Sequence, residues 1–211
     1  MSFYAVARGH QIGIFNNWNE CKMNTQGYKG AAFKKFSTRD EGEIFIADNE
    51  KTDIYKTTFD PDYYVYTDGS CSNNGRVNAM AGIGIYFGEN DPRNVSERVS
   101  GKQSNNTGEL GAIIRLYDII QEDIVSGKKI GVISDSVYAI RCVTTYGKKC
   151  EEGAWKAEVP NKEMVKKVYE LYKGKSNVRF MHVMAHTGKT DRHSVGNDGA
   201  DRLANEAIGL H

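Results

Sequence analysis

Long apolar segments are missing from this 211-residue sequence. Its hydrophobic runs extend over only a few residues, far short of the roughly 20 that a membrane-spanning helix needs. The first residues, Met1 to Ile14, contain neither the apolar core of a secretion signal nor an acid-free amphipathic transit segment. We therefore expect an intracellular protein of the cytoplasm or nucleus, without a membrane partner.

Closely spaced cysteines are also missing. The four cysteines, Cys21, Cys71, Cys142 and Cys150, form no Cys-x-x-Cys pair, which argues against a zinc ribbon. Cysteines scattered in this way are typical of reduced thiols in an intracellular protein. Internal repeats and low-complexity tracts are absent as well, so the sequence indicates an ordinary globular chain.

The chain has almost no net charge. Its formal charge is +1, so no basic field of the whole chain indicates a nucleic-acid partner. The local distribution differs, because Glu20 is the sole acid up to Arg39, among several lysines and arginines. The stretch from Asp40 to Asp62 then turns acidic. This pattern predicts a basic N-terminal module followed by an acidic boundary.

The hydrophobic pattern divides the chain into a small module over residues 1–48, a polar linker over 49–61 and a larger domain over 62–211. In the small module we expect short strands over 3–7 and 13–15, a helix from Trp18, and a second helix from about Ser37 to Asp48. The result is a small α/β unit. The linker is short and restricts the reach between the two modules.

The larger domain begins with strands and continues with alternating strands and helices. We predict strands over 63–67, 81–87, 95–99, 129–134 and 178–184, helices over 110–124, 136–143, 161–173 and 198–208, and a basic loop after the second of these helices. This order indicates an α/β fold with a mixed five-stranded sheet flanked by helices.

Four carboxylates fall at the edges of these elements. Asp68 closes the first strand of the larger domain, Asp135 ends the fourth, Glu109 lies in the first turns of the long helix, and Asp198 starts the last helix. If the first and fourth strands are parallel neighbours, Asp68 and Asp135 emerge side by side, where α/β folds bind ligands. Carboxylates without His or Cys partners favour Mg²⁺ over Zn²⁺. Two such ions, about 4 Å apart, can promote phosphodiester hydrolysis.

Each acid also has a simpler explanation. Asp68-Gly69 is a common turn pair, Asp135 and Asp198 can cap helices, and Glu109 can complement a helix dipole. Taken singly, these explanations are stronger than a metal site. The four acids together, in this order and at this spacing, favour the metal site.

Several segments, in this order, resemble type 1 ribonuclease H of the eukaryotic kind: Tyr66-Thr67-Asp68-Gly69-Ser70, Ala81 to Tyr86, Thr107-Gly108-Glu109-Leu110, Ser134-Asp135-Ser136 and Asp201-Arg202-Leu203-Ala204. The resemblance implies a ribonuclease H-like fold and an endoribonuclease that hydrolyses the RNA strand of RNA–DNA hybrids. It implies two Mg²⁺ ions, which Mn²⁺ can replace, and products with 3′-hydroxyl and 5′-phosphate ends.

The same resemblance assigns roles to single residues. It places the metal ligands at Asp68, Glu109, Asp135 and Asp198. It also places a histidine for proton transfer and product release at His186, in a His-Thr-Gly segment. An imidazole suits proton transfer near neutral pH. A lone loop histidine is usually only solvated, but the flanking Thr-Gly and the Asp198 that follows favour the catalytic role.

The first module resembles the hybrid-binding domain found at the N-terminus of such enzymes, on Phe3-Tyr4-Ala5-Val6, Gly13-Ile14-Phe15, Trp18-Asn19-Glu20-Cys21 and Phe33-Lys34-Lys35-Phe36. The resemblance implies a binding surface of Tyr4, Trp18, Phe33, Lys34 and Lys35, with aromatic rings on the DNA backbone and lysines on phosphates. It also implies weaker binding to double-stranded RNA. The alternative is that Trp18 and Phe33 are core residues, and for Phe36 we expect that role. We expect a monomer.

Further residues match the family's substrate contacts: Asn74, Asn105 and Asn106 in the minor groove, Lys102, Ser104 and Asn161 around a DNA phosphate, and Tyr138 and Tyr146 along the DNA channel. Polar contacts to the 2′-hydroxyl would distinguish RNA from DNA. Lys102 stands where an arginine is usual, which removes bidentate geometry. Glu151 and Glu152 dilute the basic protrusion and predict weak substrate binding by the larger domain alone.

Two other functions fit parts of the pattern. One is a non-catalytic protein that binds hybrids or duplex RNA through a degenerate nuclease domain, which the presence of all four acids disfavours. The other is a different enzyme on the same fold, such as a DEDD-type exonuclease or an integrase. Those enzymes lack the hybrid-binding module and the Thr-Gly-Glu-Leu context.

Overall fold

The structure is a computed structural model, and it describes residues 3–36, 39, 42, 45–46, 59–184 and 190–210. The chain forms two compact units, Met1–Phe59 and Asp60–His211, each of which is described by itself. Most of the predicted linker, most of the helix predicted over 37–48, and His186 lie outside the described residues. The module bounds at 48 and 62 therefore stay predictions.

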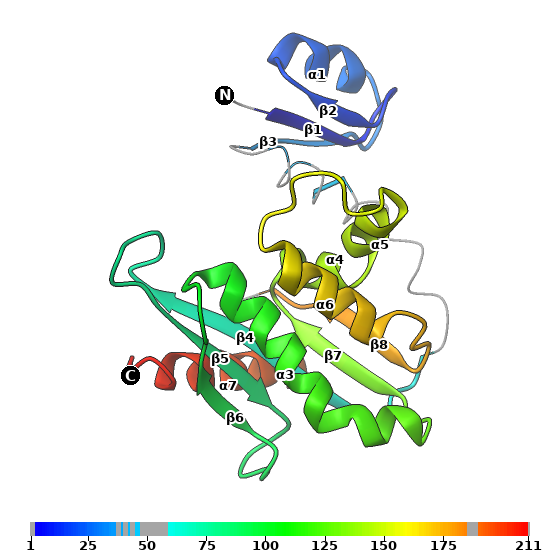
Figure 1. Cartoon of the computed structure of the whole chain (residues 1–211). Helices are drawn as coiled ribbons and strands as arrows, with labels where there is room; N and C mark the ends of the chain where they lie inside the picture. The colour runs from blue at the N-terminus through cyan, green and yellow to red at the C-terminus, as the bar shows by residue number, and fades with distance from the viewer. Residues whose placement is uncertain are drawn as a thin grey trace. The chain divides into compact units, whose positions relative to one another are not determined.

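The first unit is a three-stranded antiparallel sheet with a helix on it (Figure 1). Its elements are β1 (Phe3–Arg8), β2 (Gly13–Phe15), α1 (Trp18–Thr25) and β3 (Ala32–Phe36), with strand order β2-β1-β3. The side chain of Asn17 caps α1 by accepting a hydrogen bond from the backbone N–H of Glu20. Cys21 of α1 and Val6 of β1 are fully buried. Strand β3 was not predicted, because its Ala-Phe-Lys-Lys-Phe sequence lacks the alternation of a half-buried strand.

The second unit contains the predicted mixed five-stranded sheet, with strand order β6-β5-β4-β7-β8. Its strands are β4 (Tyr63–Ser72), β5 (Met80–Tyr86), β6 (Val95–Arg98), β7 (Ile130–Ser134) and β8 (Val178–His182). β4 pairs antiparallel with β5 and parallel with β7, so the first and fourth strands are parallel neighbours, as the placement of the acids requires. β4 is longer than predicted, because it continues beyond Asp68 alongside β5 as far as Ser72.

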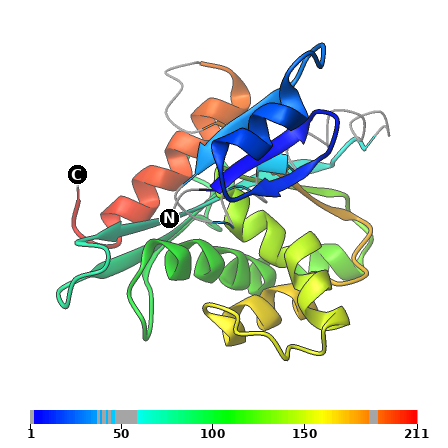
Figure 2. The same cartoon turned by 90° about the horizontal axis from the view of Figure 1, so that it is seen from above.

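Helices cover both faces of this sheet (Figures 1 and 2). One face carries α3 (Asn105–Val125), α4 (Val137–Val143), α5 (Thr145–Glu152) and α6 (Lys162–Tyr172), and the other carries α7 (Arg192–Glu206). The main core lies under the first group, with Leu110 and Ile113 of α3 fully buried. A smaller core under α7 contains Tyr66, Tyr86 and Ala200. Among the described residues, no helix combines the length and the apolar character needed to cross a membrane.

Helix α7 lies very close to the sheet because β5 carries two glycines beneath it. A Cβ at Gly82 would overlap the carbonyl oxygen of Ala204, and a Cβ at Gly84 would overlap that of Ala200. Any side chain at either position would push the helix away. The close approach therefore fixes the height of α7 above β5.

Two predicted elements were wrong. The stretch after α4 was predicted as a basic loop but forms the helix α5, where Gly147 and Cys150 are buried. The last helix begins at Arg192, not at Asp198, because Asp191 caps it by accepting from the backbone N–H groups of His193 and Ser194. This earlier start moves Asp198 from the end of a helix into its interior.

Candidate active site

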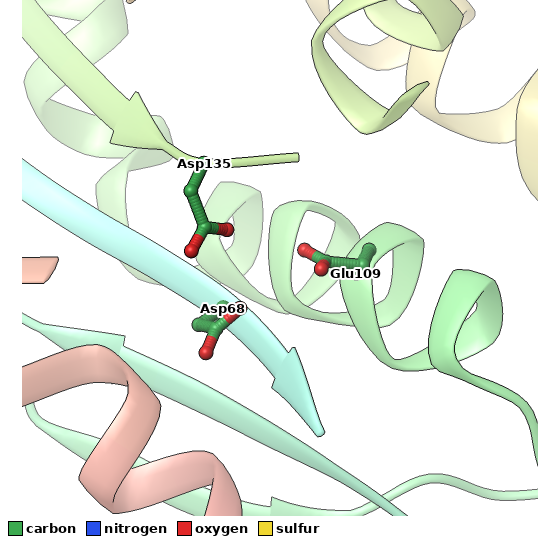
Figure 3. A group of neighbouring side chains, drawn as sticks. All are labelled: Asp68, Glu109 and Asp135. Atoms are coloured by element: carbon green, nitrogen blue, oxygen red, sulfur yellow. The ribbon is translucent and has the colours of Figure 1, made fainter. Parts of the chain in front are cut away.

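Three of the predicted acids meet where β7 ends beside β4 (Figure 3). Asp68 belongs to β4, Glu109 to the second turn of α3, and Asp135 directly follows β7. One carboxylate oxygen from each residue lies within 4.8 Å of the others. Figure 3 shows the three side chains directed into one common space from three different elements. Parallel pairing of β4 with β7 is what brings Asp68 beside Asp135.

Glu109 reaches this space because α3 approaches β4 without an intervening side chain. A Cβ at Gly69 would overlap the backbone nitrogen of Glu109, so glycine alone permits this approach. Ser104 fixes the start of α3, since its hydroxyl accepts a hydrogen bond of 3.2 Å from the backbone N–H of Thr107. Glu109 is 6% exposed, as is Asp68, so two of the three carboxylates are almost withdrawn from water.

The cluster is electrostatically strained without a cation. Burial raises the pKa of Asp68 to about 8, and the nearby carboxylates of Asp135 and Asp201 add to this effect. Burial raises the pKa of Glu109 well above its usual range, with further contributions from Asp68 and Asp135. Hydrogen bonds from the backbone N–H of Gly69 oppose both shifts. Such a group of acids holds protons or binds a cation.

The donor set suits a hard divalent cation. The acids line a cleft of about 530 Å³, to which Ser70 and Asn105 also contribute. Oxygen donors alone, without His or Cys within the described cluster, match the ligands that Mg²⁺ prefers. The residues present therefore fit a divalent metal centre.

The fourth acid that lines the cleft is Asp201, not the predicted Asp198. Asp198 is exposed on α7, whereas Asp201 is half-buried and hydrogen-bonded to Asp68. Asn197, Asp201 and Asn205 lie at successive i, i+4 positions on one face of α7, whereas Asp198 lies outside this row and is exposed. Asn197 donates to Asp135 at 3.1 Å, so this face is the one directed at the site.

Asn197 and Asn205 were missed in the sequence. The only signal they gave was their spacing around Asp201, which becomes informative once the start of the helix is known. The prediction instead assumed that a helix begins at Asp198, and an acid at a helix start is also a plain cap.

Four of the predicted substrate contacts form two hydrogen-bonded pairs. The side-chain oxygen of Asn74 accepts from the backbone N–H of Asn105 at 3.2 Å, which places the β4–β5 turn beside the start of α3. The ammonium group of Lys102 donates to the side-chain oxygen of Asn161 at 3.2 Å. Ser104, the cap of α3, follows Lys102 by two residues. The three residues of the predicted phosphate pocket, Lys102, Ser104 and Asn161, therefore lie in one region.

The remaining predicted contacts have different surroundings. Tyr138 lines the cleft with Asp135, and burial raises the pKa of its hydroxyl. Asn106 is exposed in the first turn of α3. Tyr146 packs partly against the main core. His186 lies outside the described residues.

On the first unit, three aromatic side chains form one exposed surface. The ring centroid of Trp18 lies 5.8 Å from that of Tyr4 and 5.8 Å from that of Phe33. Trp18 and Phe33 are 45% and 42% exposed, so they are not core residues. Lys35 pairs with Tyr4 across the sheet, and its ammonium group lies 5.9 Å from the Tyr4 ring. We call Tyr4, Trp18, Phe33 and Lys35 the aromatic face.

Lys34 lies on the opposite side of β3. Successive residues of a strand point to opposite faces, and Lys34 pairs with Ala5 rather than with Tyr4. Its ammonium group lies 5.6 Å from the ring of Phe36, which packs against Phe45 as a core residue would. The two lysines that were predicted to act together are therefore separated by the sheet.

Comparisons with known proteins agree for both units. A family model described as RNase H matches residues 60–209, and a model described as Ribonuclease H1 N-terminal domain matches residues 2–46. Ribonuclease H1 of Mus musculus is 30% identical over 97% of this chain and 88% of its own length. Ribonuclease H of Schizosaccharomyces pombe is 28% identical over 96% of each chain.

Solved structures share the fold of the second unit. The crystal structure of a Prototype Foamy Virus protease-reverse transcriptase mutant has a TM-score of 0.60 at 21% identity, over 72% of this chain and 22% of that chain. The solution structure of the PFV RNase H domain has a TM-score of 0.52 at 20% identity, over 68% and 92% of the two chains.

Proposed function

Because the chain belongs to the ribonuclease H family and is therefore a nuclease, we propose that it hydrolyses the RNA strand of RNA–DNA hybrids at internal phosphodiester bonds. The observation that carries this proposal is the group of Asp68, Glu109 and Asp135, in which one carboxylate oxygen of each residue lies within 4.8 Å of the others. A binding protein without catalysis would gain nothing from burying such mutually repelling groups.

We assign the metal ligands to Asp68, Glu109, Asp135 and Asp201. Two Mg²⁺ ions held there, or Mn²⁺ in their place, would supply Lewis-acid stabilisation of the attacking and leaving oxygens of the phosphodiester. The carboxylates would hold the ions in place, and the burial of Asp68 and Glu109 limits the water that competes for them. The expected products have a 3′-hydroxyl and a 5′-phosphate.

Other side chains would bind substrate and move protons. Asn74 and Asn105 lie together beside the cleft, where their amide groups can hydrogen-bond the 2′-hydroxyl that distinguishes RNA from DNA. Lys102 and Asn161, with Ser104, would hold a phosphate of the DNA strand. His186 follows β8 in the chain, and we assign it the proton transfer that accompanies departure of the product.

The first unit would provide affinity for the hybrid. Its aromatic face combines rings with a cation, as backbone-binding surfaces do. We propose that the surface binds RNA–DNA hybrid, and double-stranded RNA more weakly, and that the protein acts as a monomer.

The test is cleavage of an end-labelled RNA–DNA hybrid beside the matched RNA–RNA and DNA–DNA duplexes, with Mg²⁺ and with EDTA. We expect internal cuts in the RNA strand of the hybrid alone, only with metal, and with 5′-phosphate ends. Cleavage of the DNA duplex, or trimming from strand ends, would instead support an integrase-like or exonuclease activity.

A further inference from the structure

Asn205 connects strand β4 to the fourth acid of the cleft. Its side-chain Nδ2 lies 3.1 Å from Oδ1 of Asp201, one turn earlier on α7. Its side-chain Oδ1 lies 2.5 Å from the hydroxyl oxygen of Ser70, two residues after Asp68 on β4. A single amide therefore bridges the two elements that supply Asp68 and Asp201.

The chemistry of the three groups fixes the direction of this bridge. An ionised carboxylate only accepts hydrogen bonds, so the NH₂ end of the amide must face Asp201. The amide oxygen then faces Ser70, whose hydroxyl is free to donate to it. Both ends of the amide are satisfied in this orientation and in no other, which defines the rotamer of Asn205.

The backbone of α7 leaves the orientation of Asp201 to its side-chain neighbours. Gly82 and Gly84 set the position of the helix over β5 through its backbone at Ala200 and Ala204. Asp201 is half-buried, and its carboxylate is held by two side chains, Asp68 on the side of the site and Asn205 on the other. A ligating carboxylate held by an outer hydrogen bond binds metal more tightly because its orientation is set beforehand.

We propose that Asn205, supported by Ser70, is a positioning residue that holds Asp201 toward the metal site. The inference rests on the proposed function, because it takes Asp201 as a metal ligand. Asn205 touches neither substrate nor metal in this role and acts only through Asp201.

The test measures Mn²⁺ binding to the full chain by electron paramagnetic resonance, without nucleic acid, beside the Mg²⁺ dependence of hybrid cleavage. Asn205→Ala should weaken Mn²⁺ binding about tenfold and raise the Mg²⁺ concentration for half-maximal cleavage by a similar factor. Ser70→Ala should act in the same direction by roughly two- to tenfold, the range of one hydrogen bond. In an Asp201→Ala background, Asn205→Ala should have no further effect on Mn²⁺ binding.

Glu206→Ala is the matched control, because it removes the neighbouring side chain of α7, which pairs with exposed Arg202 and does not line the cleft. It should leave Mn²⁺ binding unchanged. The inference would be overturned if Asn205→Ala and Ser70→Ala left Mn²⁺ binding unchanged. It would also be overturned if Asn205→Ala weakened Mn²⁺ binding equally with and without Asp201, or if Asp201→Ala left Mn²⁺ binding unchanged. Failure of the wild-type chain to cut hybrids would refute the proposed function, while the Mn²⁺ data would still decide the role of Asn205.

Discussion

The side-chain Nδ2 of Asn197 lies 3.1 Å from Oδ2 of Asp135, so helix α7 reaches from one face of the sheet to the carboxylate that follows β7. Asn197 is only 1% exposed, and within the described part of the chain its Oδ1 has no hydrogen-bond partner. A buried amide is costly unless its donors are used. Its contact with Asp135 therefore orients α7 and, with it, Asp201 one turn later.

The first prediction separates the two candidate fourth acids. Asp201→Asn should reduce hybrid cleavage by about 10²-fold or more, because loss of a metal ligand costs several kcal/mol of transition-state stabilisation. Asp198→Asn removes the same charge three residues away, on an exposed position of the same helix, and should change little. Single-turnover cleavage at saturating hybrid measures both. A larger loss of cleavage rate in Asp198→Asn than in Asp201→Asn would show that Asp198, the acid predicted from the sequence, is the fourth metal ligand.

Of the four acids that line the cleft, the sequence predicted Asp68, Glu109 and Asp135 but not Asp201. Asp68 and Asp135 could be predicted because each lies where a β-rich run was expected to end, although β4 continues past Asp68 to Ser72. The parallel pairing of their strands was assumed and is present in the structure. Asp198 was chosen because the helix was expected to start there. The actual start depends on the Asp191 cap, and the sequence between His186 and Asp198 gives no hydrophobic periodicity to reveal it.

Tertiary contacts account for the other differences. The strand β3 exists because Phe3 to Arg8 pairs with it, although its own residues are mostly exposed. The opposite orientation of Lys34 and Lys35 follows from that pairing. Helix α5 forms because Gly147 and Cys150 are buried against α4 and α6. The lysine-rich sequence of this segment does not indicate such a contact.

The second prediction concerns pH and the metal-free protein. The folded-state pKa of Asp68, about 8, lies above the ordinary value of 3.8. The proton on Asp68 therefore stabilises the folded state fully below about pH 4, and this contribution is lost as the pH rises through about 8. Asp68→Asn mimics the protonated form at every pH. Measured in EDTA, its Tm should exceed that of the wild type by an amount that grows from about pH 5 to pH 9.

Each kcal/mol would shift the Tm by about 2–4 °C in a protein of this size. Mg²⁺ should reduce the difference between the two proteins, because it replaces the proton in the wild type but binds poorly to the variant. Asp198→Asn serves as the control, since its exposed carboxylate lies outside the cleft. A Tm difference that stays constant with pH would contradict the shift assigned to Asp68.

The third prediction concerns His186. His186→Ala should slow multiple-turnover cleavage by about 10- to 10³-fold, because proton transfer by a positioned side chain contributes on that scale. Hybrid binding should persist, since the carboxylates and the aromatic face are untouched. His193→Ala changes another histidine of the same region, whose Nδ1 lies 3.3 Å from the hydroxyl oxygen of Tyr66. Equal cleavage rates for His186→Ala and the wild type would show that His186 has no catalytic role.

The fourth prediction is that the first unit supplies most of the affinity for the hybrid. In the second unit the acids of α5 hold nearby lysines: Glu151 pairs with Lys173 at 2.5 Å, and Glu152 lies 3.9 Å from Lys148. Those cations are partly neutralised for phosphate binding. A fragment of residues 60–211 should therefore bind hybrid markedly more weakly than the full chain in a salt titration. Equal affinities across the titration would show that the first unit is not the anchor.

The fifth prediction uses the sheet of the first unit to separate two neighbouring lysines. Lys35 lies on the aromatic face beside Tyr4, whereas Lys34 lies on the other side of β3. Lys35→Ala should lower the slope of log affinity against log salt by about one, the value for one lost phosphate contact. Lys34→Ala, which removes the same charge from the same strand, is the matched control and should change the slope less.

Trp18→Ala completes this comparison, because it removes a stacking surface without removing charge. The indole is 45% exposed beside Tyr4 and Phe33, and its loss should weaken hybrid binding by about 1–3 kcal/mol. The salt slope should stay the same, since no counterion release depends on an uncharged ring. Cleavage at saturating hybrid should survive all three changes, because the metal ligands belong to the other unit. A larger change of slope for Lys34→Ala than for Lys35→Ala would place the nucleic acid on the face opposite to Trp18.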